Sequence, residues 1–170
     1  MNYLEHNEVW AWCDQHRVAL VDSRAEPAPE ERLGRAWRDV YGATGPSGRE
    51  PEVAATAVAA VGSWTECLVW VVLWGVWASS EDWPAYYSVR GARGERRALD
   101  VAPGHLYTAD DHALLLTDLA QLMTFGWEAH VLPVVGTQPP STRLFISHDG
   151  WVELLEPTTP GARVNGQGHR

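Results

Sequence analysis

Three adjacent residues, Ser147, His148 and Asp149, carry the side chains of a hydrolase triad. A working triad draws its hydroxyl, imidazole and carboxylate from different segments, because the three groups must line up in space. Neighbouring residues of a strand point to opposite faces, so these three cannot line up. The Asp149-Gly150 pair instead predicts a hairpin turn. At the tip of such a turn, His148, Asp149 and Trp151 are candidate contacts for a binding partner.

Histidines and carboxylates elsewhere in the chain could carry acid–base or metal chemistry. Asp110, Asp111 and His112 are adjacent, but no H-x-x-x-H or H-E-x-x-H spacing accompanies them. The two aspartates are better explained as first-turn residues of a helix, where the helix dipole stabilises acids. We therefore predict no metal and no cofactor. The alternative, a small hydrolase or metal-dependent enzyme, needs residues from separate segments to meet in one pocket: His105, His130 or His148 with Asp110, Asp111 or Asp149.

The concentrated positive charge of the chain lies in one short segment that contains Arg90, Arg93, Arg96 and Arg97. If a helix continued through the segment, Arg90, Arg93 and Arg97 would share one face. Such a group could clamp a phosphate, a carboxylate or an acidic partner through bidentate hydrogen bonds. We take Arg90, Arg93 and Arg97 as candidate partner-binding residues. The alternative is a solvated helix end, where arginines complement the dipole.

The common nucleotide and nucleophile motifs are absent from the sequence. There is no G-x-x-x-x-G-K-[ST] loop, because the chain has no lysine, and no G-x-G-x-x-G or G-x-S-x-G. The two cysteines, Cys13 and Cys67, form neither a C-x-x-C pair nor a disulfide framework. No catalytic residue is predicted.

Composition narrows the class of protein. The 170 residues carry a net charge of −9 and include ten tryptophans. An acidic chain is a poor ligand for nucleic acid and favours encounter with a basic partner, whereas Trp is enriched at protein interfaces. No signal peptide is recognisable, and the most apolar run, residues 67–78, is too short to span a membrane. We expect a cytoplasmic protein with another protein as its partner.

Hydrophobic spacing and turn residues predict the elements that must position these groups. The expected helices cover residues 7–17, 29–41, 51–61, 80–93 and 108–125, and the expected strands cover 66–78, 105–107, 127–135, 144–147 and 151–155.

Two of these elements carry most of the expected core. Residues 66–78 are apolar on both alternating faces, with Leu68, Trp70 and Trp74 on one of them, which predicts a buried strand in a covered sheet. Residues 108–125 begin with a T-x-x-D capping pattern and end before Gly126, which suits a left-handed helix stop. Pro133 places the strand 127–135 at a sheet edge or ends it early.

Taken together, the pattern predicts an α+β (mixed α/β) fold. It has N-terminal helices, a central buried strand, a long amphipathic helix and a C-terminal antiparallel β-meander in one domain, residues 1–156, with a disordered tail at 157–170. The composition is similar to that of small bacterial immunity and accessory proteins, although no motif matches a family. We therefore expect a non-catalytic protein-binding module that acts through a charged, Trp-containing surface.

Overall fold

The protein is described here from a computed structural model. The structure describes residues 1–18, 36–37, 41–42, 45–46, 48–74, 82–138, 142–148 and 151–155. The helices are α1 (His6–Gln15), α2 (Glu50–Val61), α3 (Asp82–Ala92) and α4 (His112–Phe125), with a 3-10 turn, η2 (Ala109–Asp111), before α4. The strands are β1 (Asn2–Leu4), β2 (Ala36–Trp37), β3 (Tyr41–Gly42), β4 (Gly45–Pro46), β5 (Glu66–Leu73), β6 (Gly104–Thr108), β7 (Glu128–Val134), β8 (Arg143–Ser147) and β9 (Trp151–Leu155).

Seven of these strands form one sheet in the order β1-β6-β5-β7-β8-β9-β2, and every neighbouring pair is antiparallel. The strands β7, β8 and β9 follow one another along the chain and in space, which makes the predicted C-terminal meander. The α+β fold class is therefore confirmed. Within the described residues, no helix is long and apolar enough to cross a membrane.

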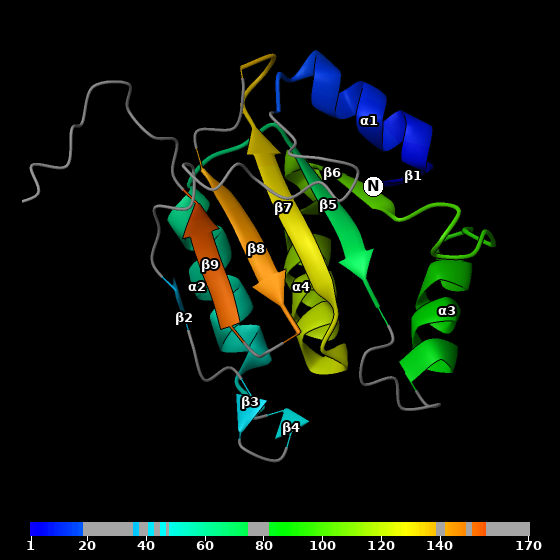
Figure 1. The fold of residues 1–170 in the computed structure, drawn as a ribbon, viewed down its shortest axis with the longest axis vertical. Helices are drawn as coiled ribbons and strands as arrows, with labels where there is room; N and C mark the ends of the chain where they lie inside the picture. The colour runs from blue at the N-terminus through cyan, green and yellow to red at the C-terminus, as the bar shows by residue number, and fades with distance from the viewer. Residues whose placement is uncertain are drawn as a thin grey trace, which may run out of the picture.

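The sheet separates two hydrophobic clusters. On one face, α2 and α4 lie side by side and cover Val69, Val71 and Val131 (Figure 1). On the other face, α1 packs Val9, Trp12 and Cys13 against Leu68 and Trp70. β5 is therefore buried on both faces, which confirms the covered strand that its apolar residues at both alternating positions predict.

An irregularity in β5 corrects the predicted position of Trp74. The register with β7 shifts between Val71 and Leu73, so that the simple alternation ends there. Trp74 packs against the cluster under α2 and α4, whereas Leu68 and Trp70 face α1. The sequence places all three on one face because it contains no signal for the extra residue.

Helix ends follow local chemistry. Glu5, rather than Asn7, caps α1 and forms a capping box with Glu8. Thr108 and Asp111 form the predicted box, although it caps the 3-10 turn that leads into α4. Gly126 ends α4 at φ 65°, the predicted left-handed stop.

One predicted helix and the predicted position of one strand are wrong. Residues 29–41 do not form one helix, because Ala36–Trp37 is a strand that pairs with β9 and Tyr41 begins β3. Their helical spacing is overridden by hydrogen bonding to the sheet. The strand that contains Pro133 is not at an edge, because β7 lies between β5 and β8. The proline is tolerated because the ladder with β8 ends at Val131.

Candidate functional site

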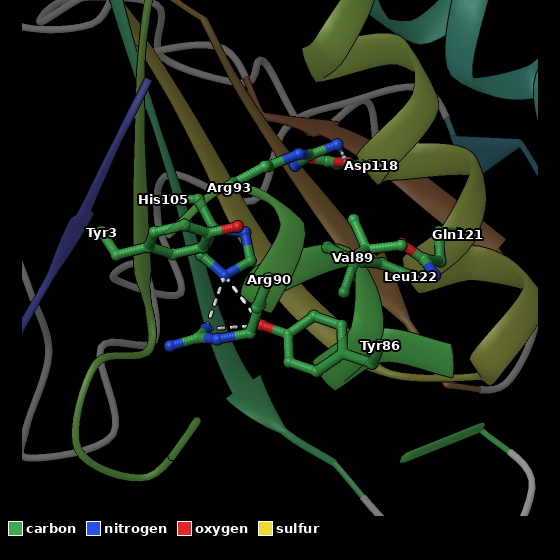
Figure 2. Close-up of a pocket in the computed structure, with 9 residues that line it drawn as sticks. All are labelled: Tyr3, Tyr86, Val89, Arg90, Arg93, His105, Asp118, Gln121 and Leu122. Carbon is green, nitrogen blue, oxygen red and sulfur yellow. Dashed lines mark hydrogen bonds and ion pairs between the residues drawn. The ribbon is translucent and has the colours of Figure 1, made fainter. Parts of the chain in front are cut away.

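Polar side chains gather between β1, α3, β6 and α4, around a small cavity (Figure 2). Its polar lining residues are Tyr3, Tyr86, Arg90, Arg93, His105, Asp118 and Gln121. The cavity volume is about 10 Å³, which is about the space that one water molecule needs. An organic substrate therefore does not fit there.

Arg90 lies in the interior, with 1% of its surface exposed. Its Nη1 donates to the Tyr86 hydroxyl at 2.8 Å, and both terminal nitrogens donate to the carbonyl oxygen of Ala102 at 3.2 Å. Its guanidinium carbon lies 4.5 Å from the ring centre of Tyr3 and 5.3 Å from that of Tyr86. Aromatic faces and neutral oxygens thus stabilise this cation, and no described carboxylate forms an ion pair with it.

His105 is held neutral. Because Arg90 donates to the Tyr86 oxygen, the Tyr86 hydroxyl is free to donate to Nε2 of His105, 2.9 Å away. That assignment leaves the ring proton on Nδ1. Burial, with Arg90 nearby, lowers the pKa of His105 to about 3. His105 is therefore no proton acceptor for chemistry near neutral pH.

Arg93 forms the ion pair of the cluster. Its two terminal nitrogens donate to the two carboxylate oxygens of Asp118, at 2.5 and 2.8 Å, and Tyr107 donates its hydroxyl to the same carboxylate at 2.5 Å. This bidentate pair raises the pKa of Arg93, while burial and the negative charge of Asp118 raise that of Tyr107. The pair joins the end of α3 to the middle of α4.

Arg97, in the turn after α3, also forms ion pairs within the chain. It donates to Glu95 at 2.5 Å, to Glu5 at 3.0 Å and to the Tyr3 carbonyl oxygen at 3.1 Å. Hydrogen bonds from Arg97 lower the pKa of the buried Glu95 carboxyl to about 2. The side chain thus links the N-terminal strand to the turn.

These positions correct the sequence interpretation of the arginines. The helix ends at Ala92 and Gly94 adopts φ 84°, so Arg97 does not continue the helical face of Arg90 and Arg93. Arg90 is too buried to touch a partner, and it is not a solvated helix-end residue either. Arg93 and Arg97 retain partial exposure, 22% and 38% of the side chain, but each is ion-paired within the chain.

The other predicted contacts lie at the β8–β9 hairpin. The hairpin is present, with Ser147 paired to Trp151. His148 is hydrogen-bonded to Glu128 through Nδ1 and keeps 24% of its side chain exposed. Asp149 lies outside the described residues, as does the side chain of Trp151.

The described histidines and carboxylates of the enzyme alternative do not meet in one pocket. His105 contacts Tyr86 and Arg90, His130 packs against Phe145, and Asp111 accepts hydrogen bonds from Thr108. Across the part of the chain that the structure describes, no group of three or more His, Cys, Asp or Glu side chains is arranged to hold a metal ion.

Sequence reasoning missed five members of the cluster: Tyr3, Tyr86, Tyr107, Asp118 and Gln121. Two signals were available. Asp118 interrupts the apolar stripe of Leu115, Leu119 and Leu122, and a carboxylate at such a position needs a buried partner. Tyr86 precedes Arg90 by four residues, the spacing at which helical side chains meet.

Comparison with known proteins adds no relative, because no protein family, curated protein or solved structure matches this chain.

Proposed function

We propose that this protein is a non-catalytic binding module, of an immunity-like or accessory kind, and that the outer face of α1 contacts a basic partner protein. We call this face the α1 surface and define it by Trp10 and Asp14, which are four residues apart and therefore lie on one side of the helix. Asp14 is exposed and Trp10 is half-buried. A carboxylate beside a partly exposed Trp forms the kind of charged, Trp-containing surface that binds proteins.

The position of Asp14 in α1 is the observation that carries this proposal. It lies in the last turn of α1, which contains no basic residue. The partial negative charge of a helix C-terminus disfavours a carboxylate there. Glu66, with 42% of its side chain exposed, adds a second acid, because it accepts a hydrogen bond from Trp12 of the same helix. A locally unfavourable charge is expected where function requires it.

The internal contacts of the arginines support the proposal that the partner is basic. Arg90, Arg93 and Arg97 are bound inside the chain, so they do not offset acids at the α1 surface. With a net charge of −9, the chain attracts a basic protein and speeds its association.

The hydrolase alternative has less support. Its candidate base His105 is neutral and enclosed, and the cavity beside it has room for about one water molecule.

The test is affinity capture from the native host with the tagged full chain, at low and moderate salt. Two variants are compared with the wild type: Asp14→Lys, and Glu52→Lys at an exposed position of α2, on the opposite face of the sheet. Both change the net charge equally, because each replaces −1 by +1 and takes −9 to −7.

We expect one stoichiometric basic protein that is lost as salt rises, lost with Asp14→Lys and retained with Glu52→Lys. Equal retention by both variants would remove the α1 surface from the proposal. The absence of any partner at either salt would contradict the binding role.

A further inference from the structure

The two helices that lie side by side on one face of the sheet, α2 and α4, carry almost no charge on their outer side (Figure 1). Neither helix contains a lysine or an arginine, and their acidic residues are Glu50, Glu52 and Asp118. Glu50 and Asp118 are buried, which leaves Glu52, at the N-terminal end of α2, as the exposed acid of the two helices. A surface helix normally turns charged residues to water, whereas a helix that is apolar on all sides is buried.

Small and apolar residues take the outward positions of both helices. We call this surface the α2–α4 face and define it by exposed or half-buried residues of the two helices. These are Thr56, Ala59 and Ala60 of α2 and Leu116, Thr117 and Thr124 of α4. At the rim of the face, Leu114 keeps 37% of its surface exposed. Because the two helices pack against each other, these residues form one continuous surface, and a large exposed surface without charge marks an interaction site.

The threonine hydroxyls of the α2–α4 face already donate within their own helices. Oγ1 of Thr56, Thr117 and Thr124 donates to the carbonyl oxygen four residues earlier, at 2.9, 2.9 and 2.8 Å. A hydroxyl that is bonded in this way keeps its hydrogen bond when water is removed from it. Another molecule can therefore cover this face without leaving a threonine donor unsatisfied.

The distribution of charge indicates which molecule fits this face. With a net charge of −9, two copies of the chain repel each other wherever their acids meet. The α2–α4 face has its acid, Glu52, only at one end, so it is a place where two copies can approach without that repulsion. A basic protein finds few carboxylates to pair with there. Both helices also lack the lysines and arginines that bind helices to a membrane surface.

The size of the face fits a weak dimer. Helices of 12 and 14 residues are about 18 and 21 Å long, at about 1.5 Å per residue. Neighbouring helix axes lie about 8–10 Å apart, so the pair presents a face roughly 20 Å square. Such an area is at the small end of specific interfaces, and we therefore expect a reversible contact that depends on protein concentration.

We propose that the α2–α4 face is the interface of a symmetric dimer, in which a second copy of this chain covers it. The same residues of both copies meet about a two-fold axis, so that four helices pack between two sheets. The α1 surface lies on the opposite face of the sheet and stays exposed in each copy. This inference is therefore independent of the α1 surface, and its test requires no partner protein.

The test is sedimentation equilibrium of the full chain over about 1 µM to 1 mM, the range of dissociation constants expected for an interface of this size. We expect the average mass to rise reversibly from that of one chain toward that of two. Because salt screens the repulsion between two acidic chains, the dimer should be stronger at moderate than at low salt. The mass of one chain at every concentration, or a dimer that salt dissociates, would overturn the proposal.

Three variants locate the interface. Ala59→Glu and Thr117→Glu place a carboxylate on the α2–α4 face, one on each helix, whereas Ala85→Glu places one at an exposed position of α3. Each variant has a net charge of −10 instead of −9. Since symmetry brings two new carboxylates into the interface, both face variants should dimerise about tenfold more weakly or less, and Ala85→Glu within about twofold of the wild type. Melting temperatures close to that of the wild type establish that the variants fold. Equal dimerisation of all three would contradict the α2–α4 face as the interface.

Flotation with phosphatidylcholine vesicles tests the other occupant that an apolar face could have. We expect the wild-type chain to remain in the lipid-free fraction. Binding of the chain to these vesicles, lost in Ala59→Glu and kept in Ala85→Glu, would show that lipid covers the face and would overturn the proposal.

Discussion

Arg90 and Arg93 are three residues apart in the chain, but different groups surround their guanidinium charges. Arg93 meets the carboxylate of Asp118, whereas Arg90 meets two aromatic rings, a phenol and backbone carbonyl oxygens. An ion pair compensates a buried charge directly, while neutral acceptors compensate its hydrogen bonds and leave the charge. The two residues therefore have different consequences when they are replaced.

The ion pair of Arg93 should be a large contributor to stability. Arg93→Gln leaves the Asp118 carboxylate, 7% exposed, without its cation. We expect the free energy of unfolding in urea to fall by about 3 kcal/mol. Arg96→Gln, at an exposed position of the same segment, should change it by less than about 0.5 kcal/mol. Similar small effects of the two substitutions would show that the ion pair contributes little.

His105 should make the protein sensitive to mild acid. Its pKa is about 3 in the folded chain and about 6.5 in the unfolded chain, so below pH 6.5 the unfolded state binds more protons. Stability is lost as the pH falls from about 6.5 to about 3. Between pH 7 and pH 5, we expect this residue to cost about 2 kcal/mol.

The measurement is urea unfolding of the wild type and His105→Gln at both pH values. The variant has no imidazole at this position, so the loss of unfolding free energy on acidification should be smaller by that amount. Parallel losses in the two proteins would mean that His105 takes up its proton in the folded state.

The residues of the cluster were only partly predictable. Arginines and histidines are conspicuous in a sequence, so Arg90, Arg93, Arg97 and His105 were singled out. Their burial was not foreseen, because it depends on Tyr86 of α3 and Asp118 of α4, which tertiary packing brings beside them. Charge alone suggested a surface role for side chains that lie inside.

At the scale of elements, the close approach of α1 to the sheet depends on Gly104. A Cβ built at this position would lie 2.5 Å from Cγ2 of Val9 and 3.0 Å from Cβ of Leu4. The glycine thus permits β6 to lie directly against β1 and α1. In the sequence, Gly104 follows Pro103, a pair that is typical of a turn, so no local signal indicates this contact.

Gly104→Ala should accordingly destabilise the protein. The added methyl group forces α1 or β1 away, and overpacking of this kind costs roughly 1–3 kcal/mol. Gly91→Ala is the matched control, because its added Cβ meets nothing within 4 Å and it lies in α3. There we expect no loss, or a gain of up to about 1 kcal/mol from helix propensity. Chemical denaturation checks both, and a neutral Gly104→Ala would refute the contact.

The elements themselves were predicted best where local signals agree. Helices α2 and α4 have apolar residues, N-terminal signals and a glycine at the C-terminus that all indicate a helix, and strand β5 is apolar at both alternating positions. Prediction failed at residues 36–37, where a helical spacing of apolar residues is overridden by pairing with β9. It failed again at Pro133, where the extent of a neighbouring strand decides whether a proline is tolerated. Neither pairing can be read from a local window.

For the whole molecule, the distribution of charge matters more than its sum. The net charge of −9 could be deduced from the sequence. The structure adds that Arg90, Arg93 and Arg97 form their hydrogen bonds and ion pairs within the chain. Acids such as Asp14 and Glu52, in contrast, remain exposed. This distribution is consistent with the proposed binding of a basic protein, which complementary charge would make rapid and salt-sensitive.

Calorimetric titration of the captured partner into the wild type, Asp14→Lys and Glu52→Lys tests the binding role most directly. Lysine complements the dipole at the C-terminus of α1, so Asp14→Lys should be as stable as the wild type or up to about 1 kcal/mol more stable. Its affinity for the partner should nevertheless fall about tenfold or more, as expected for the loss of a contact worth about 1.4 kcal/mol and the introduction of a repulsive charge. Glu52→Lys should bind within about threefold of the wild type, since only the uniform change in net charge acts on it. An unchanged affinity of a folded Asp14→Lys variant, or an equal loss in both, would contradict the account.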